Sequence, residues 1–348
     1  MSAVAEAPGK AAAASPGGPR GSLFRAELHR FRARRFIRLL LLLAVLGWVL
    51  AVVVALLHYG TPTAADHAQA RQSMQQVVAQ SEQGRQQCLD DPQAKGAPPG
   101  VSPEDVCGPP LQLSDLSENQ FLPKQPFDLA SNGGRGAIGF GAAAAVLGFV
   151  IGATWIGAEW SSRSLVALLF WVPRRSSVFS AKIGVLTLAA ALLGVVAQVG
   201  WLIMATLLRA VAGNGRALPA HFWDHLFATQ GRAVLLTVLI ALLGFGLTNL
   251  IRNTGAALGV GFVYFAIAET AVRALRPAWE PWLLSTDAGA LVSPGGLRVY
   301  IFDAIGRNGF TEPRVYQVTN LQAGIELTVV IAIVIGVGVW LFNRRDVH

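Results

Sequence analysis

Residues 36–57, FIRLLLLLAVLGWVLAVVVALL, decide the fold class of this chain, because they form a long apolar run with one charged side chain near its start. About 20 apolar residues in a helix cross the ~30 Å hydrocarbon core of a bilayer. The apolar region of a cleaved signal peptide is shorter, at about 7–15 residues. The stretch therefore predicts an uncleaved membrane-spanning helix.

Five further apolar stretches follow this first span. They cover residues 136–156, 183–208, 233–251, 254–272 and 323–342. Only Arg252 and Asn253 separate the fourth span from the fifth, which predicts a tight helical hairpin. The sequence thus predicts an all-α membrane protein, in which residues 36–348 form one domain of six transmembrane helices.

The composition agrees with a membrane protein. Of the 348 residues, 53% are hydrophobic and only 14% are charged, whereas a soluble domain carries about 25% charged residues. The net charge of +8 would indicate nucleic acid in a soluble protein. Here the cations flank apolar runs, so contact with anionic lipid and membrane orientation explain them better, and we expect no nucleic-acid partner.

The N-terminal region has two parts. Residues 1–21 are rich in Ala, Gly and Pro, which predicts a disordered tail. In residues 22–35, Phe24, Leu28 and Phe31 form one helical stripe. Five arginines surround it: Arg25, Arg30, Arg32, Arg34 and Arg35. The pattern predicts an amphipathic helix in the lipid headgroup layer; the alternative is a basic flank that only sets orientation.

Charge also predicts the topology. With the N-terminus inside, the cytoplasmic segments are 1–35, 157–182, 252–253 and 343–348. Lys and Arg are about twice as dense there as in the opposite segments, as the positive-inside rule requires. We therefore expect a multi-pass protein of the cell membrane with both termini cytoplasmic.

The loop of residues 58–135 then lies outside. It contains a candidate helix near 64–90 and both cysteines of the chain, Cys88 and Cys107. Thiols outside the cytoplasm meet an oxidising environment, so a Cys88–Cys107 disulfide is expected, with two free cysteines as the alternative. Residues 277–322 are expected to be mostly extracytoplasmic as well.

Catalytic patterns are missing from the sequence. It has no GxxxxGK[ST] phosphate loop, no Ser nucleophile elbow and no Cys/His set with zinc-ligand spacing. His221, Asp224 and His225 (HFWDH) form a weak candidate for a metal site, with an interfacial aromatic helix as the alternative. We expect no enzyme activity, cofactor or resident metal in this chain.

Polar residues inside the spans are few, and Gln198, Asn249 and Glu269 are the clearest. Ionisable groups within a membrane are candidates for function by default, so a role in a substrate path is one interpretation. The other is a local pair of Glu269 with Arg273, one helical turn away. Two small-residue pairs, Gly148/Gly152 and Gly255/Gly259, favour close helix packing within the subunit.

The segment 157–182, GAEWSSRSLVALLFWVPRRSSVFSAK, joins the second and third spans on the predicted cytoplasmic side. Residues 160–172 can form a helix whose apolar stripe rests on the membrane, and Pro173 would end it. Ser161, Arg163 and Ser164 would face the cytoplasm. A short amphipathic connector is the alternative.

The run Glu159-Trp160-x-x-Arg163-Ser164, followed by Trp171-Val-Pro173-Arg174-Arg175 and Lys182, resembles the first cytoplasmic loop of type-2 ABC transporter permeases. The layout of residues 22–348 and the tail Phe342-Asn-Arg344-Arg345-Asp346 are also similar to that family. Two features differ. Arg163 stands where the family often has Gly, and the loop 58–135 is longer than usual.

The resemblance implies a permease subunit, in the usual case of an exporter, that forms the translocation path. A second permease subunit, identical or different, would complete it, and a separate cytoplasmic ATP-binding-cassette ATPase would drive it. The coupling residues implied are Glu159, Trp160, Arg163, Ser164, Pro173, Arg174 and Arg175. The competing hypothesis is a non-transport membrane scaffold or sensor that uses the loop 58–135.

Overall fold

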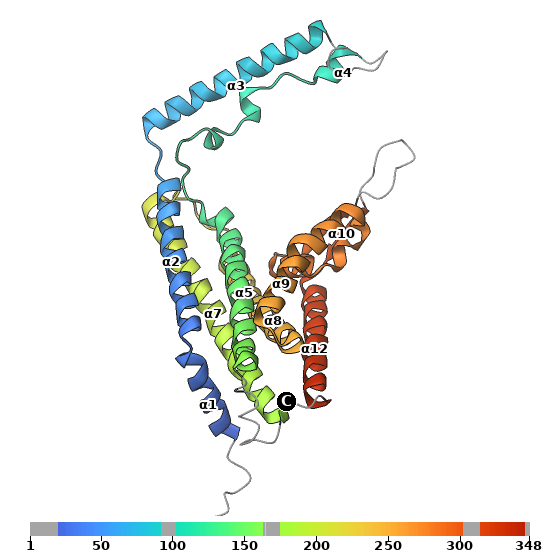
Figure 1. Ribbon diagram of the computed structural model, residues 1–348. Coiled ribbons are helices and arrows are strands. Elements are labelled where there is room, and N and C mark those ends of the chain that lie inside the picture. Colours follow the sequence, from blue (N-terminus) through green and yellow to red (C-terminus); the bar gives the residue numbers. More distant parts are fainter. Residues whose placement is uncertain (1–19, 92–101, 163, 165–174, 302–313, 345–348) are drawn as a thin grey trace, which may run out of the picture. The chain divides into compact units, whose positions relative to one another are not determined.

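The computed structural model describes residues 20–91, 102–162, 164, 175–301 and 314–344 (Figure 1). In this part of the chain, six helical segments are long and apolar enough to cross a membrane, as expected for an all-α multi-pass membrane protein. They are Arg35–His58 (α2), Leu129–Ser161 (α5), Ser176–Ala212, Phe222–Ile251 (α8), Thr254–Leu275 and Asn320–Phe342. Each contains one of the six predicted spans.

The chain divides into two compact units. The first comprises Met1–Leu43, Ile138–Gln198 and Ala228–His348, and the second comprises Ala44–Ala137 and Val199–Phe227. Both units take pieces of several spans, so neither corresponds to a continuous stretch of sequence.

An aromatic cluster forms part of the core of the first unit. Phe31 from α1 (Arg20–Ala33), Trp155 from α5, Phe179 from α7 (Arg175–Ala212) and Phe245 from α8 are all buried there. Helices α5 and α8 approach closely at Gly152, where an added Cβ would lie 2.1 Å from the carbonyl oxygen of Ala241. A residue without a side chain is therefore needed at this crossing.

The turn between the fourth and fifth spans is as short as the sequence predicts. Arg252 adopts a φ of 61°, and Asn253 caps α9 (Thr254–Phe262) by accepting a 3.0 Å hydrogen bond from the amide of Ala256. The fifth span continues as a π-helix, η4 (Val263–Ala268), and then as α10 (Glu269–Leu275).

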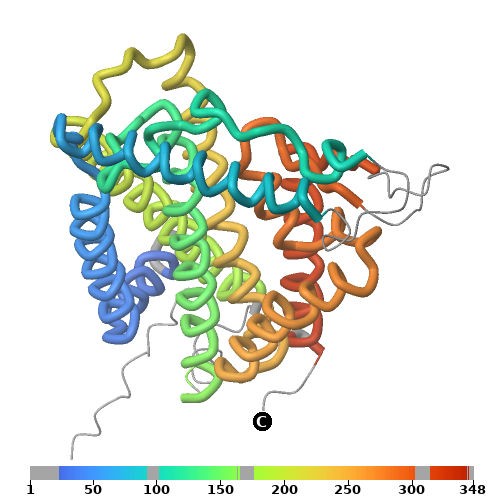
Figure 2. The backbone as a smooth tube through the Cα atoms, turned by 90° about the horizontal axis from the view of Figure 1, so that it is seen from above, coloured from blue at the N-terminus to red at the C-terminus, as the bar shows by residue number. Residues whose placement is uncertain are grey.

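Between α10 and the last span, the chain forms a small folded region that the sequence did not reveal. It contains η5 (Pro277–Trp282), α11 (Leu284–Val292) and an antiparallel pair of strands, β1 (Leu297–Ile301) and β2 (Arg314–Val318). Helix α11 packs against α12 (Asn320–Arg344), where the orange and red parts of the tube meet in Figure 2. The side-chain amide of Asn320 donates to carbonyls near the end of α11, those of Ala290, Leu291 and Ser293.

The second unit contains the long polar loop. Helix α3 (Ala64–Asp90) begins with a capping box between Thr63 and Asp66, which matches the helix expected near 64–90. The short α4 (Pro103–Cys107), η2 (Leu113–Asp115) and η3 (Glu118–Gln120) follow. The structure pairs Cys88 with Cys107, and their Cα atoms are 5.8 Å apart. The disulfide expected from the sequence is therefore present.

Candidate functional site: a charged clamp around Lys182

Three helices of the first unit meet at the ammonium group of Lys182, whose side chain is fully buried in α7. Its Nζ atom lies 2.7 Å from Oε2 of Glu27 on α1. It also lies 2.8 Å and 2.7 Å from Oε1 and Oε2 of Glu159 on α5. One cation thus joins two carboxylates from two other helices.

Two arginines, one on α1 and one just after it, also pair with these carboxylates. Arg34 donates to Oε1 of Glu159 at 3.0 Å and to the carbonyl oxygen of Thr154 at 3.2 Å. Arg30 donates to Oε1 of Glu27 at 3.1 Å, and half of its side chain is exposed. Burial lowers the pKa of the Arg34 guanidinium, and the carboxylates of Glu159 and Glu27 oppose this effect. Arginine remains charged in proteins, so the ion pair persists.

An indole ring forms one wall of this cluster. The guanidinium carbon of Arg34 lies 4.4 Å from the ring centre of Trp155, and Nζ of Lys182 lies 4.9 Å from it. Phe31 packs edge-on against the same ring at 5.1 Å. Cations over an aromatic face gain free energy, and the gain is larger where water is excluded. We call Glu27, Arg34, Glu159 and Lys182 the charged clamp.

The apolar stripe of α1 explains why Glu27 is buried. Phe31 is buried, and Phe24 and Leu28 pack partly buried against the aromatic cluster. Glu27 lies on the same face of the helix, so it enters the protein with them. This stripe was expected to rest on lipid. Residues Arg20–Ala33 are helical, but the apolar face of this helix is used largely for contact with the protein.

The stability of the clamp is sensitive to the loss of any one of its four charges. Removing a buried charge from water is costly, and attraction between partners offsets that cost only when every charge stays paired. Taking away one member therefore leaves an uncompensated buried charge. The clamp fixes the end of α5 and the start of α7 to α1.

Glu159 and Trp160, both expected to contact a partner, have internal roles in the described structure. Glu159 belongs to the clamp. Trp160 donates from Nε1 to Oδ1 of Asn249 at 3.3 Å, Arg252 lies over its ring at 4.4 Å, and Phe342 packs edge-on at 5.7 Å. Trp160 therefore ties the end of α5 to α8, to the α8–α9 turn and to α12.

The other expected coupling residues are placed only in part. Ser164 is exposed and accepts a 2.9 Å hydrogen bond from the hydroxyl of Ser162. Arg163, Pro173 and Arg174 lie outside the described residues, as does most of the expected helix 160–172. Arg175 is the first residue of α7, and its side chain is not described.

The expected polar residues within the spans do not gather at one place. Asn249 accepts from Trp160, and the backbone carbonyl of Gln198 accepts from Gln230 at 3.4 Å. Glu269 pairs with Arg273 at 3.3 Å, which is the local pair expected from their spacing. Glu269 also accepts hydrogen bonds from the amide and hydroxyl groups of Ser285, so it fixes the start of α11.

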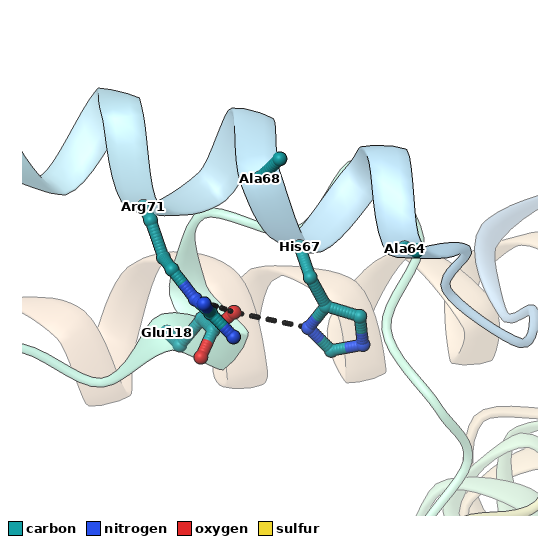
Figure 3. Close-up of a pocket in the computed structure, with 5 residues that line it drawn as sticks. All are labelled: Ala64, His67, Ala68, Arg71 and Glu118. Carbon is teal, nitrogen blue, oxygen red and sulfur yellow. Dashed lines mark hydrogen bonds and ion pairs between the residues drawn. The ribbon is translucent and has the colours of Figure 1, made fainter.

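The second unit has a shallow pocket of about 470 Å³ beside α3 (Figure 3). Ala64, His67, Ala68, Arg71 and Glu118 line it. His67 and Arg71 both point toward Glu118, at 3.0 Å and 3.4 Å. Hydrogen bonding to His67 lowers the pKa of Glu118, and the charge of Arg71 adds to the effect.

The HFWDH sequence lies at the start of α8, where His221 precedes the first helical residue, Phe222. His221 pairs with Asp224 at 3.2 Å, and His225 is exposed as well. In the part of the chain that the structure describes, no three His, Cys, Asp or Glu side chains are placed to hold a metal ion.

Comparison with known proteins adds no assignment: no protein-family model matches this chain, and no curated protein matches it.

The sequence predicts only part of the charged clamp. Glu159 and Lys182 belong to the motif of residues 159–182, whereas Glu27 and Trp155 belong to no motif in the sequence. A useful signal was available, because a lysine in the first turns of an apolar helix requires an acidic partner nearby.

Proposed function

We propose that this chain is the membrane-spanning permease subunit of an ABC exporter, driven by a separate cytoplasmic ATPase and paired with a second permease subunit. Residues 157–182 would dock on the ATPase. The observation that carries the proposal is the Lys182–Glu159 ion pair, because it joins the two ends of this segment and fixes both to Glu27.

A permease without a nucleotide site can be driven only if motion of a partner reaches its spans mechanically. A segment attached at both ends to stiff helices meets that requirement. The clamp supplies the stiffness at both ends, and Trp160 adds contacts to α8 and α12. Ser164, between these anchors, is exposed, so this position is accessible to a partner.

A cysteine cross-linking experiment tests the docking. The described cysteines are both in the disulfide, so Ser164→Cys introduces a reactive thiol in the segment. With a bifunctional thiol reagent in native membranes, we expect the Ser164→Cys chain to cross-link to an ATP-binding-cassette ATPase. Ser114→Cys, exposed in the loop 58–135, is the matched control and should capture no ATPase.

Charge reversal locates the docking face. Arg163→Glu should reduce co-purification of the ATPase while leaving membrane insertion intact. Equal recovery with both chains would remove Arg163 from the docking face. Failure to recover any ATPase with the wild-type chain, together with no cross-link at residue 164, would refute the permease proposal.

The braced polar loop favours a second candidate function, a membrane scaffold or sensor that binds a partner outside the cytoplasm. Helix α3 has 27 residues, and the Cys88–Cys107 disulfide ties its end to α4. A long helix whose end is fixed in this way suits the binding of a partner protein. Capture of a partner by Ser114→Cys but of no ATPase by Ser164→Cys would favour this second function.

A further inference from the structure

Asp287 on α11 is a buried carboxyl group without a hydrogen-bond donor for one of its oxygens. Only 1% of the residue is exposed, and Oδ1 has no hydrogen-bond partner among the described residues. An ionised carboxylate in such a place would lose its hydration without compensation. A ligand that neutralises the group is therefore expected.

A second carboxyl group, that of Glu326 on α12, interacts with Asp287. The side chains of Asp287 and Glu326 lie within hydrogen-bonding reach of each other. Glu326 also accepts a 2.9 Å hydrogen bond from Gln322 on its own helix. Two ionised carboxylates only accept hydrogen bonds, so a bond between them requires a proton on one of the two.

The other ionisable groups around Asp287 do not neutralise it. Glu269 on α10 adds negative charge, and Tyr264 on η4 is a neutral phenol at ordinary pH. Arg273 is engaged by Glu269 at 3.3 Å and by Glu280 of η5 at 3.4 Å. On β1, Arg298 is exposed.

A metal ion is a poor candidate for the missing ligand. No set of three His, Cys, Asp or Glu side chains suitable for a metal exists within the described ranges. A proton needs only two carboxyl oxygens, and aspartic protease dyads share one in this way. The buried carboxyl group of Asp287 beside Glu326 therefore suits a proton.

We propose that Asp287 and Glu326 form a proton-binding carboxyl pair, in which one shared proton holds α11 against α12. The site does not depend on the proposed function, because all of its residues lie outside the charged clamp and the segment 157–182. When the proton leaves, two adjacent negative charges repel each other, and the contact between α11 and α12 weakens.

The pair should change state near neutral pH. Burial raises the pKa of Asp287 to about 7, and the negative charge of Glu326 adds to the effect. The unfolded chain has an ordinary Asp pKa of about 4, so the folded state binds the proton more tightly. This stabilisation is fully present below about pH 4 and is lost as the pH rises through about 7.

Infrared spectroscopy and thermal unfolding of the purified full-length chain in nanodiscs test the proposal. The variants are Asp287→Asn and Glu326→Gln, and Glu280→Gln is the matched control, because it removes a nearby carboxyl group that does not belong to the pair. Spectra and unfolding temperatures are compared from about pH 5 to about pH 9, a range that avoids the titration of ordinary carboxyl groups.

In the wild type and in Glu280→Gln, we expect a protonated-carboxyl band in acid that disappears with a midpoint near pH 7. Asp287→Asn should lack it. In Glu326→Gln the band should persist with its midpoint moved to a lower pH, because Asp287 stays buried but the negative charge of Glu326 no longer adds to the effect. Asp287→Asn should also unfold at a higher temperature than the wild type in alkali, because its neutral amide can donate to Glu326 at every pH. If Asp287→Asn does not fold, the wild type and Glu326→Gln decide the matter. A wild type without this band, a band that survives in Asp287→Asn, or an unchanged midpoint in Glu326→Gln would overturn the proposal.

Discussion

The ammonium group of Lys182 lies 2.7 Å from the carboxylate of Glu27, although 155 residues separate the two in the chain. Both side chains are fully buried. This contact attaches α1, which precedes the first span, to the start of the third span. It explains how a polar helix near the N-terminus becomes part of the first unit.

Replacing Lys182 with methionine should destabilise the first unit strongly. The carboxylates of Glu27 and Glu159 would remain buried without their shared cation, and breaking a buried pair in this way costs about 3–5 kcal/mol. Arg30→Met is the matched control, because Arg30 pairs with the same Glu27 while half of its side chain is exposed. That change should cost about 0–1 kcal/mol. Thermal unfolding in detergent measures both, and equal losses would contradict the importance of burial.

The packing of α5 on α8 predicts the effect of one methyl group. Gly152→Ala places a Cβ 2.1 Å from the carbonyl oxygen of Ala241, so the helices must separate. We expect a loss of about 1–3 kcal/mol. Gly139→Ala on the same helix is the control, since an added Cβ there meets nothing within 4 Å. Helix propensity favours alanine over glycine at both positions, so equal damage from Gly139→Ala would show that close packing at Gly152 is not the cause.

Reduction of the Cys88–Cys107 disulfide should loosen the end of α3 without unfolding the first unit. Closing a loop of this length stabilises the folded state by about 3 kcal/mol in the chain-entropy description. Hydrogen exchange of α3 and α4 should therefore accelerate in the Cys88→Ser/Cys107→Ser double variant. Alkylation supplies an independent check. Non-reduced wild-type protein in intact membranes should resist labelling, whereas each single variant should take up one label.

The contact of Glu118 with α3 should weaken in acid. Hydrogen bonding to His67 holds the pKa of Glu118 below its usual value, so the contribution of this carboxylate is present above the unfolded pKa of about 4.3 and is lost as the pH falls through the lower folded value. Hydrogen exchange at the N-terminal half of α3 should rise in that acid range. Glu118→Gln should reduce this dependence to the part that remains from Asp66, whose pKa is lowered by its hydrogen bonds with Thr63 in the capping box. Asp90→Asn, an exposed change at the far end of α3, should preserve the full dependence.

Labelling of single cysteines, introduced into a variant that lacks the disulfide, tests the membrane orientation. Ser114→Cys should react with a membrane-impermeant thiol reagent in intact cells, because the loop 58–135 is predicted outside. Ser164→Cys should react only after the membrane is opened. Reporter fusions after residues 110 and 348 should give an outside and an inside signal, respectively. The opposite pattern at either position would show that the positive-inside argument fails for this chain.

The sequence by itself determined the elements whose causes are local. The length of the apolar runs located all six spans, because a helix needs such a run to cross a bilayer whatever it packs against. Arg252 and Asn253 marked the turn between α8 and α9, because they alone interrupt the apolar sequence there, and the structure adds that Asn253 caps α9. The disulfide was also accessible, because the chain offers only one possible pair of cysteines.

Only the tertiary structure decided what these elements touch. The stripe of Phe24, Leu28 and Phe31 has the same pattern whether it rests on lipid or on protein, because both surfaces are apolar, and the fold directs it to the aromatic cluster. The strands β1 and β2 are short, and each depends on pairing with the other across the 12 residues 302–313. The pairing of Lys182 with Glu27 and Glu159 depends on three helices meeting. A buried charge selects its partner by position in space, which no spacing along the chain encodes.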